Sequence, residues 1–198
     1  GIYNVSFGKK QTLNTEKRAL FVGENHNASQ GMNNWVAGDN NTLTSGSQII
    51  AGGKDHNVAT SANTVVSGKN NTLTTANESA VFGEDHTLTT SSNGLITGKN
   101  NTLQSGASNT VLGEDNSSTN NNRSLVSGYR NITSNNQRGF IHGDKNTITG
   151  TTNTSVMGTL NKVIDISCAS VYGSQNDISG TITDSIMGGL LNKIHDVV

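Results

Sequence analysis

The stretch NTVVSGKNNTLTTANESAVFG, residues 63–83, contains one complete repeat of this chain and decides its fold. Its two glycines, Gly68 and Gly83, are fifteen residues apart, and glycine recurs at this spacing along the sequence. The series has thirteen members: Gly8, Gly23, Gly38, Gly53, Gly68, Gly83, Gly98, Gly113, Gly128, Gly143, Gly158, Gly173 and Gly188. A strict period of this length is the signature of a solenoid, in which one small unit stacks on copies of itself.

Apolar residues occupy two fixed positions around each glycine. Two residues before it, only Ser6 interrupts the apolar series Phe21, Val36, Ala51, Val66, Val81, Ile96, Val111, Val126, Ile141, Val156, Val171 and Ile186. Five residues after it, Ser118, Thr133 and Lys193 interrupt the series Leu13, Ala28, Leu43, Val58, Leu73, Leu88, Leu103, Ile148, Val163 and Ile178. β-branched residues separated by Gly- and Asn-rich turns favour short strands and sharp corners. The sequence therefore predicts an all-β, parallel β-solenoid of about thirteen 15-residue coils, in a single domain over 1–198.

Composition excludes several classes of function. The net charge is −1 and basic residues do not cluster, so neither nucleic acid nor direct contact with a membrane is expected. Cys168 is the only cysteine, which excludes a disulfide framework, and we expect neither a metal site nor a cofactor. Because the chain begins at Gly1 without a methionine, we interpret it as an excised fragment whose targeting and anchoring segments lie outside it.

The positions three and one before each glycine share the opposite face of the strand, and their volumes compensate. Trp35 is followed by the small Ala37, whereas Ala80 is followed by the large Phe82. A packed face has reason to conserve volume and a solvated face has none, so we expect a second copy of the chain to cover this face. The candidate interface residues of this homo-oligomer are Leu20, Trp35, Ile50, Val65, Phe82, Leu95, Leu112, Leu125, Phe140, Met157, Tyr172 and Met187.

Several repeats resemble the Asn-Ser-Val-Ala-Ile-Gly motif of the YadA-like head of trimeric autotransporter adhesins. The matching segments are 63–68 (NTVVSG), 78–83 (ESAVFG), 109–113 (NTVLG), 154–158 (TSVMG) and 169–173 (ASVYG). The resemblance spans essentially the whole chain. It implies a left-handed parallel β-roll assembled as a homotrimer, with residues 189–198, which carry an extra residue after Gly188, running toward a neck.

The same resemblance implies a function in host attachment. The chain would be the head of an adhesin on the surface of a Gram-negative bacterium, anchored in the outer membrane through a C-terminal region outside this sequence. Its implied partner is an extracellular-matrix protein (collagen, fibronectin or laminin) or an immunoglobulin-fold receptor of the carcinoembryonic-antigen type.

The sequence also leads us to expect no enzymatic activity, and it leaves two alternative functions open. No Ser-His-Asp set, carboxylate pair or phosphate-binding loop is evident, so we expect no enzymatic activity. Thr-x-Thr pairs such as Thr72/Thr74 and Thr87/Thr89 suggest an ice-binding β-solenoid as one alternative, although Asn, Ile, Lys and Asp interrupt the array. The other alternative is a passive spacer in a surface fibre.

Three histidines recur every thirty residues, where most other repeats have Asn: His26, His56 and His86. We predict that they are turn residues, because His, like Asn, is enriched at left-handed backbone positions. Successive histidines would be two coils apart, about 10 Å, which is too far to share one metal ion.

The repeat changes most between Gly113 and Gly143, where Ser118 and Thr133 replace apolar residues. Two arginines occupy the same position in adjacent repeats here, and a Tyr-Arg pair replaces the usual turn. Stacked like charges cost stability, and Tyr and Arg are enriched in binding hot spots. The candidate receptor-binding residues are therefore Arg123, Tyr129, Arg130 and Arg138.

Overall fold

The computed structural model describes residues 3–164, 166–177, 179–180, 182–186, 188–190 and 193. The chain divides into two compact units, residues 1–99 and 100–198. The described part of each unit consists of parallel β-strands joined by turns, and none of its residues is helical. The prediction of an all-β parallel solenoid is confirmed.

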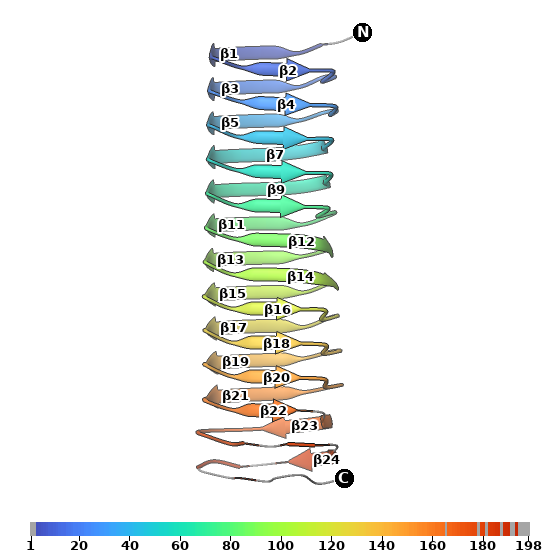
Figure 1. The fold of residues 1–198 in the computed structure, drawn as a ribbon, viewed down its shortest axis with the longest axis vertical. Coiled ribbons are helices and arrows are strands. Elements are labelled where there is room, and N and C mark those ends of the chain that lie inside the picture. Colours follow the sequence, from blue (N-terminus) through green and yellow to red (C-terminus); the bar gives the residue numbers. More distant parts are fainter. Residues whose placement is uncertain are drawn as a thin grey trace. The chain divides into compact units, whose positions relative to one another are not determined.

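The first unit alternates strands of two separate parallel sheets (Figure 1). We call them long and short strands because most strands of the first sheet have five residues and most of the second have three. In order, the long strands are β1 (Val5–Lys9), β3 (Leu20–Glu24), β5 (Trp35–Asp39), β7 (Ser47–Lys54), β9 (Ala62–Lys69), β11 (Ala80–Glu84) and β13 (Leu95–Lys99). The short strands are β2 (Thr12–Asn14), β4 (Asn27–Ser29), β6 (Thr42–Thr44), β8 (Asn57–Ala59), β10 (Thr72–Thr74) and β12 (Thr87–Ser92).

The second unit repeats this arrangement. Its long strands are β15 (Thr110–Glu114), β17 (Leu125–Tyr129), β19 (Phe140–Asp144), β21 (Ser155–Thr159), β23 (Ile166–Val171) and β24 (Ile182–Ile186). Its short strands are β14 (Thr102–Ala107), β16 (Ser117–Thr119), β18 (Ile132–Ser134), β20 (Thr147–Thr149) and β22 (Lys162–Ile164).

Strand register shows that each 15-residue repeat is one turn of the solenoid. Val66 lies opposite Val81 and Gly68 lies opposite Gly83 in the pairing of β9 with β11. Within the described residues, six short strands in the first unit and five in the second make about eleven complete turns. The thirteen predicted coils are thus not all confirmed.

The register changes near the C-terminal end, where β23 pairs with β24. Ile166 lies opposite Ile182, an offset of sixteen residues, so the extra residue enters before Gly188 and not after it as predicted. A one-residue shift moves a side chain to the other face of a strand. Ile186, which we expected in the apolar core, is accordingly 85% exposed. The greater part of the predicted neck segment, 189–198, lies outside the described residues.

Corners form where single residues adopt the left-handed conformation. In the turn that follows Gly68 these are Asn70, Thr75 and Glu78, with φ of 54°, 53° and 52°. Gly68 itself has φ of 120°, which side chains rarely permit, and a Cβ on it would lie 2.0 Å from the carbonyl oxygen of Gly83. The glycine series therefore reflects the close approach of one coil to the next.

The core of each turn contains the two apolar positions predicted from the sequence. All described members of both series from Phe21 to Val171 are buried. A third corner of the core is filled by pairs whose volumes compensate within one turn. Gly46 faces Ile49, and a Cβ added to Gly46 would lie 3.0 Å from Ile49 Cγ1. Gly31 faces Asn34 in the same way. Because interiors are close-packed, the large partner fills the space that its small partner leaves.

Candidate functional site

The described candidate interface residues lie on the outer face of the long-strand sheet in each unit, except Tyr172, which directly follows β23. The most exposed are Trp35 (55%), Ile50 (50%), Phe82 (41%), Phe140 (41%) and Tyr172 (40%). Six others are partly exposed: Leu20, Val65, Leu95, Leu112, Leu125 and Met157. Met187 lies outside the described residues. The long strands are therefore not buried on both faces within one chain, and their outer side chains remain available for contact.

The outer face of the short-strand sheets is mainly polar. Thr72 and Thr74 on β10 flank the buried Leu73, and Thr87 on the adjacent β12 lies opposite Thr72. Asn57 on β8 lies opposite Thr72 on its other side, and in the second unit Lys162 on β22 lies opposite Thr147 on β20. The threonine pairs thus point outward, as the ice-binding alternative requires, but other side chains interrupt them.

The four candidate receptor-binding residues fall at two different corners. Tyr129 ends β17 and Arg130 follows it, whereas Arg123 precedes the same strand. A five-residue strand separates these corners by about 16 Å. Arg138 lies at the corner of Arg123, one turn further along, because the preceding residues Asn122 and Gln137 pair across adjacent turns.

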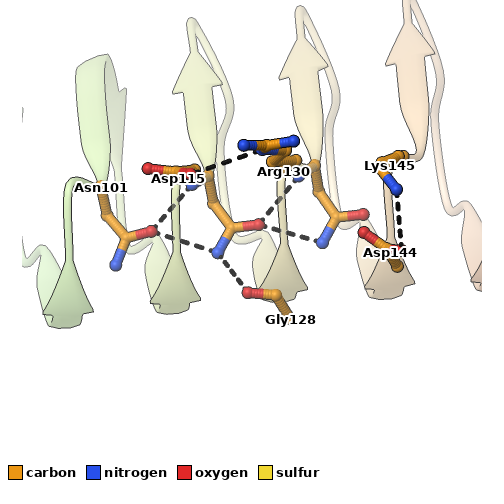
Figure 2. A network of polar contacts seen from close by, with 8 residues as sticks. Asn101, Asp115, Gly128, Arg130, Asp144 and Lys145 are labelled. Atoms are coloured by element: carbon orange, nitrogen blue, oxygen red, sulfur yellow. Dashed lines mark hydrogen bonds and ion pairs between the residues drawn. The ribbon is translucent and has the colours of Figure 1, made fainter.

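Arg130 is already engaged within its own corner (Figure 2). Its Nε lies 3.5 Å from Asp115 Oδ2, and its guanidinium carbon lies 4.6 Å from the ring centroid of Tyr129. The ion pair is partly exposed to solvent, and pairs of this kind contribute at most about 1 kcal/mol. A ligand at this corner would have to compete with these two contacts.

Arg123 and Arg138 instead line a surface groove of about 330 Å³. The other lining residues are Ala107, Ser108, Asn122 and Gln137. Both arginine side chains are exposed, and neither forms an ion pair within the described residues. The structure therefore brings these two candidates together and separates them from Tyr129 and Arg130.

Ser118 and Thr133 interrupt the second apolar series because they form hydrogen bonds with a buried amide. Ser118, Thr133 and Asn121 are all buried, and Asn121 Nδ2 donates to Ser118 Oγ at 2.7 Å and to Thr133 Oγ1 at 2.6 Å. The two hydroxyls satisfy an amide that points into the core, which would otherwise be costly. We interpreted this break as the mark of a binding surface, and that interpretation is wrong for Ser118 and Thr133.

Amide and imidazole side chains, all buried except the half-buried Gln11, form what we call the Asn/His ladder, with one residue per turn directly after the first left-handed corner residue. Its members are Gln11, His26, Asn41, His56, Asn71 and His86 in the first unit, and Asn101, Asn116, Asn131, Asn146, Asn161 and Asn176 in the second. Asn116 Nδ2 donates to Gly128 O at 2.8 Å and to Asn101 Oδ1 at 3.1 Å, and its Oδ1 accepts from Asn131 N at 3.0 Å (Figure 2). The ladder joins adjacent turns from Gln11 to His86 in the first unit and from Asn101 to Asn161 in the second.

The three histidines are ladder members and not left-handed turn residues, which corrects the prediction. The left-handed residue is the one before each, such as Asp55 with φ of 58° before His56. His56 is 1% exposed, its Nε2 lies 3.0 Å from Gly52 O, and its Nδ1 accepts from Asn71 N at 3.3 Å. These contacts require a neutral ring with the proton on Nε2. The ladder could have been recognised from the recurrence of Asn and His at one position.

Acid is expected to destabilise the first unit through His56. Burial lowers the pKa of His56, against the smaller opposing effects of its hydrogen bond to Gly52 and the charge of Asp55. The unfolded state then binds the proton more readily, so this stability is present above about pH 6.5 and is lost as the pH falls toward the folded-state pKa. His56→Asn, which copies Asn41 and Asn71, should remove that loss. Denaturant midpoints at pH 7.5 and pH 5 measure it, and equal pH dependence in both proteins would contradict the assignment.

The described residues offer neither a metal-binding cluster nor a membrane-spanning helix. Among the residues that the structure describes, no group of three His, Cys, Asp or Glu side chains could hold a metal ion. The described part of the chain also contains no helix that is long and apolar enough to cross a membrane.

Comparison with known proteins adds little to this picture. No protein-family model and no curated protein sequence matches the chain. Among solved structures, the crystal structure of the polySia-specific acetyltransferase NeuO aligns with 95% of this chain and 78% of its own, at 14% sequence identity and a TM-score of 0.19. A similarity this low carries no argument about the function of this chain.

Proposed function

We propose that this chain is the non-enzymatic head of a homotrimeric adhesin on the surface of a Gram-negative bacterium. In this proposal three left-handed β-rolls pack through their long-strand sheets. The remaining outer surfaces bind a host extracellular-matrix protein or an immunoglobulin-fold receptor. The adhesin-like motifs in the sequence and the outer surface of the long-strand sheets support this function.

The outer apolar side chains of the long strands carry the proposal. Trp35 and Ile50 lie side by side in the register of β5 and β7, and Leu125 and Phe140 do so in β17 and β19. Exposed apolar patches of this kind mark protein–protein contacts. A face that repeats in every turn is suited to packing against the same face of identical chains, because each copy presents it at the same spacing.

We expect a solution mass of three times 20.7 kDa by light scattering after gel filtration. Introducing charge at Leu125 and Phe140, as Leu125→Glu with Phe140→Glu, should dissociate the trimer, because unpaired carboxylates would be buried in the apolar contact. Ile132→Glu is the matched control, since Ile132 is 53% exposed on the other sheet and should leave the mass unchanged. A monomeric parent, or dissociation by the control alone, would contradict the proposed packing.

Binding assays separate the adhesin from its alternatives. The trimer should bind immobilised collagen, fibronectin, laminin or an immunoglobulin-fold receptor, and it should show no thermal hysteresis. Thermal hysteresis would favour the ice-binding alternative, whose surface would be the threonine pairs of the short strands. A trimer that binds no host protein in an extract would favour a spacer.

A further inference from the structure

The groove between Arg123 and Arg138 contains two residues that are unfavourable there, because their backbone conformation is left-handed and their charges are alike. Both residues adopt the left-handed conformation, with φ of 53° and 55°. Asn33, Asn63, Asn93 and Asn153 occupy the equivalent position in other turns, and Asn tolerates this conformation better than Arg. Two successive turns of the second unit thus place the less suitable residue at this corner.

The two arginines also repel each other. Their backbones are held one turn apart by the hydrogen bonds from Arg123 N to Ala107 O and from Arg138 N to Asn122 O, at 2.9 and 2.8 Å. Adjacent turns of a parallel sheet are about 4.8 Å apart. Like charges on directly opposite residues destabilise a sheet, and an anion bound between them would offset that repulsion.

No carboxylate of the described second unit neutralises this pair. Asp115 contacts Arg130, and Asp144 contacts Lys145, at the corner on the other end of the long strands (Figure 2). The ion pairs of the second unit's described residues thus leave Arg123 and Arg138 unneutralised. Departures from local rules without internal compensation are typical of functional sites.

The rest of the groove offers uncharged hydrogen-bonding groups. Asn122 Oδ1 accepts from Ala107 N at 3.0 Å, which leaves the amide nitrogen of Asn122 as a donor. The hydroxyl of Ser108 and the amide of Gln137 can both donate and accept hydrogen bonds. A sugar presents hydroxyls of the same dual character. Guanidinium groups bind carboxylate and sulfate oxygens through charge-assisted hydrogen bonds.

We propose that this groove binds an acidic polysaccharide, with one carboxylate or sulfate group held between Arg123 and Arg138 and the sugar hydroxyls on Ser108, Asn122 and Gln137. This inference deepens the proposed adhesive function and rests on it, since it names the class of surface to which the head attaches. It also removes Tyr129 and Arg130 from the binding site.

The first unit provides contrasting grooves at the equivalent corner. One is lined by Arg18, whose neighbour at this position in the next turn is Asn33, so it has a single arginine. Another is lined by Glu78 between Asn63 and Asn93, and a carboxylate there disfavours an anion. Of these three grooves, that of Arg123 and Arg138 is the one with stacked cations.

The test measures binding of a chondroitin sulfate decasaccharide, a hyaluronan decasaccharide and a poly-glutamate peptide by isothermal titration calorimetry. The variant Arg123→Asn with Arg138→Asn removes the charges and retains a residue that the left-handed corner accepts. Arg18→Asn and Arg130→Asn are the matched controls. We expect saccharide binding that weakens with added salt and falls at least about tenfold in the double variant, with both controls unchanged.

The saccharides distinguish the two anions, because hyaluronan carries only carboxylates and chondroitin sulfate carries both groups; binding of either supports the proposal. No saccharide binding, equal binding by the double variant, preference for poly-glutamate, or an equal loss in Arg18→Asn would overturn it. Light scattering and matrix-protein binding are measured on the same samples. A trimer that binds a matrix protein but no saccharide would overturn this inference alone, whereas a monomer would overturn the proposed function.

Discussion

Replacing Gly53 with alanine is expected to lower the free energy of unfolding by at least about 4 kcal/mol. Gly53 has φ of 119°, and a Cβ on it would lie 2.0 Å from the carbonyl oxygen of Gly68 on the next turn. Neither the backbone of β7 nor that of β9 can shift without breaking the hydrogen bonds of their pairing. The loss should appear as a lower denaturation midpoint by circular dichroism at fixed protein concentration.

The neighbouring Gly52 provides the control for this substitution. A Cβ on Gly52 would have Ser67 Oγ as its nearest neighbour, at 4.0 Å, and the residue does not require a positive φ. Gly52→Ala should therefore be neutral or stabilise the protein by about 0.5–1 kcal/mol, since glycine weakens a strand. If both variants lost the same stability, close approach between the turns would not be the reason for the glycine series.

Removing one rung of the Asn/His ladder should have the next largest effect. Asn71 is fully buried, its Nδ2 donates to Gly83 O at 2.9 Å, and its Oδ1 accepts from His86 N at 3.0 Å. Asn71→Ala deprives two buried backbone groups of these partners, at about 1–3 kcal/mol each. We expect a total loss of about 2–6 kcal/mol in the free energy of unfolding.

Asn57→Ala is the same change at an exposed position of β8 and should alter stability by less than about 0.5 kcal/mol. Hydrogen exchange can localise the effect, because the amide of His86 should lose protection in Asn71→Ala and keep it in Asn57→Ala. Unchanged protection of His86 in both variants would show that the ladder does not hold adjacent turns together.

The sequence was sufficient to predict the solenoid because its determinants repeat. The spacing from Gly68 to Gly83 equals the register offset between adjacent long strands. Val66 and Leu73 are buried, as their columns indicate. Each turn contacts chiefly its neighbours, so a local pattern specifies the fold without knowledge of distant contacts.

The candidate site was predicted only in part, because residues that are close in the sequence can lie at different corners of one turn. Arg123 and Arg138 line one groove as their equivalent positions suggest, but Arg130 is paired with Asp115 at another corner. Distance around the coil is not evident from sequence separation. Arg123 and Arg130 are close in the chain, but a strand lies between them.

Periodicity alone thus determined the parallel solenoid, its turn length and its two apolar columns, since the same spacing must be satisfied in every turn. Only the tertiary structure showed which backbone groups the ring of His56 meets and that Ser118 and Thr133 satisfy Asn121. It also showed that the register shift carries Ile186 out of the core. These features depend on which way a side chain points and which backbone group it meets one turn away. Residue type alone does not fix the direction of a side chain or its backbone partner, because both depend on the hydrogen-bond geometry of the folded chain.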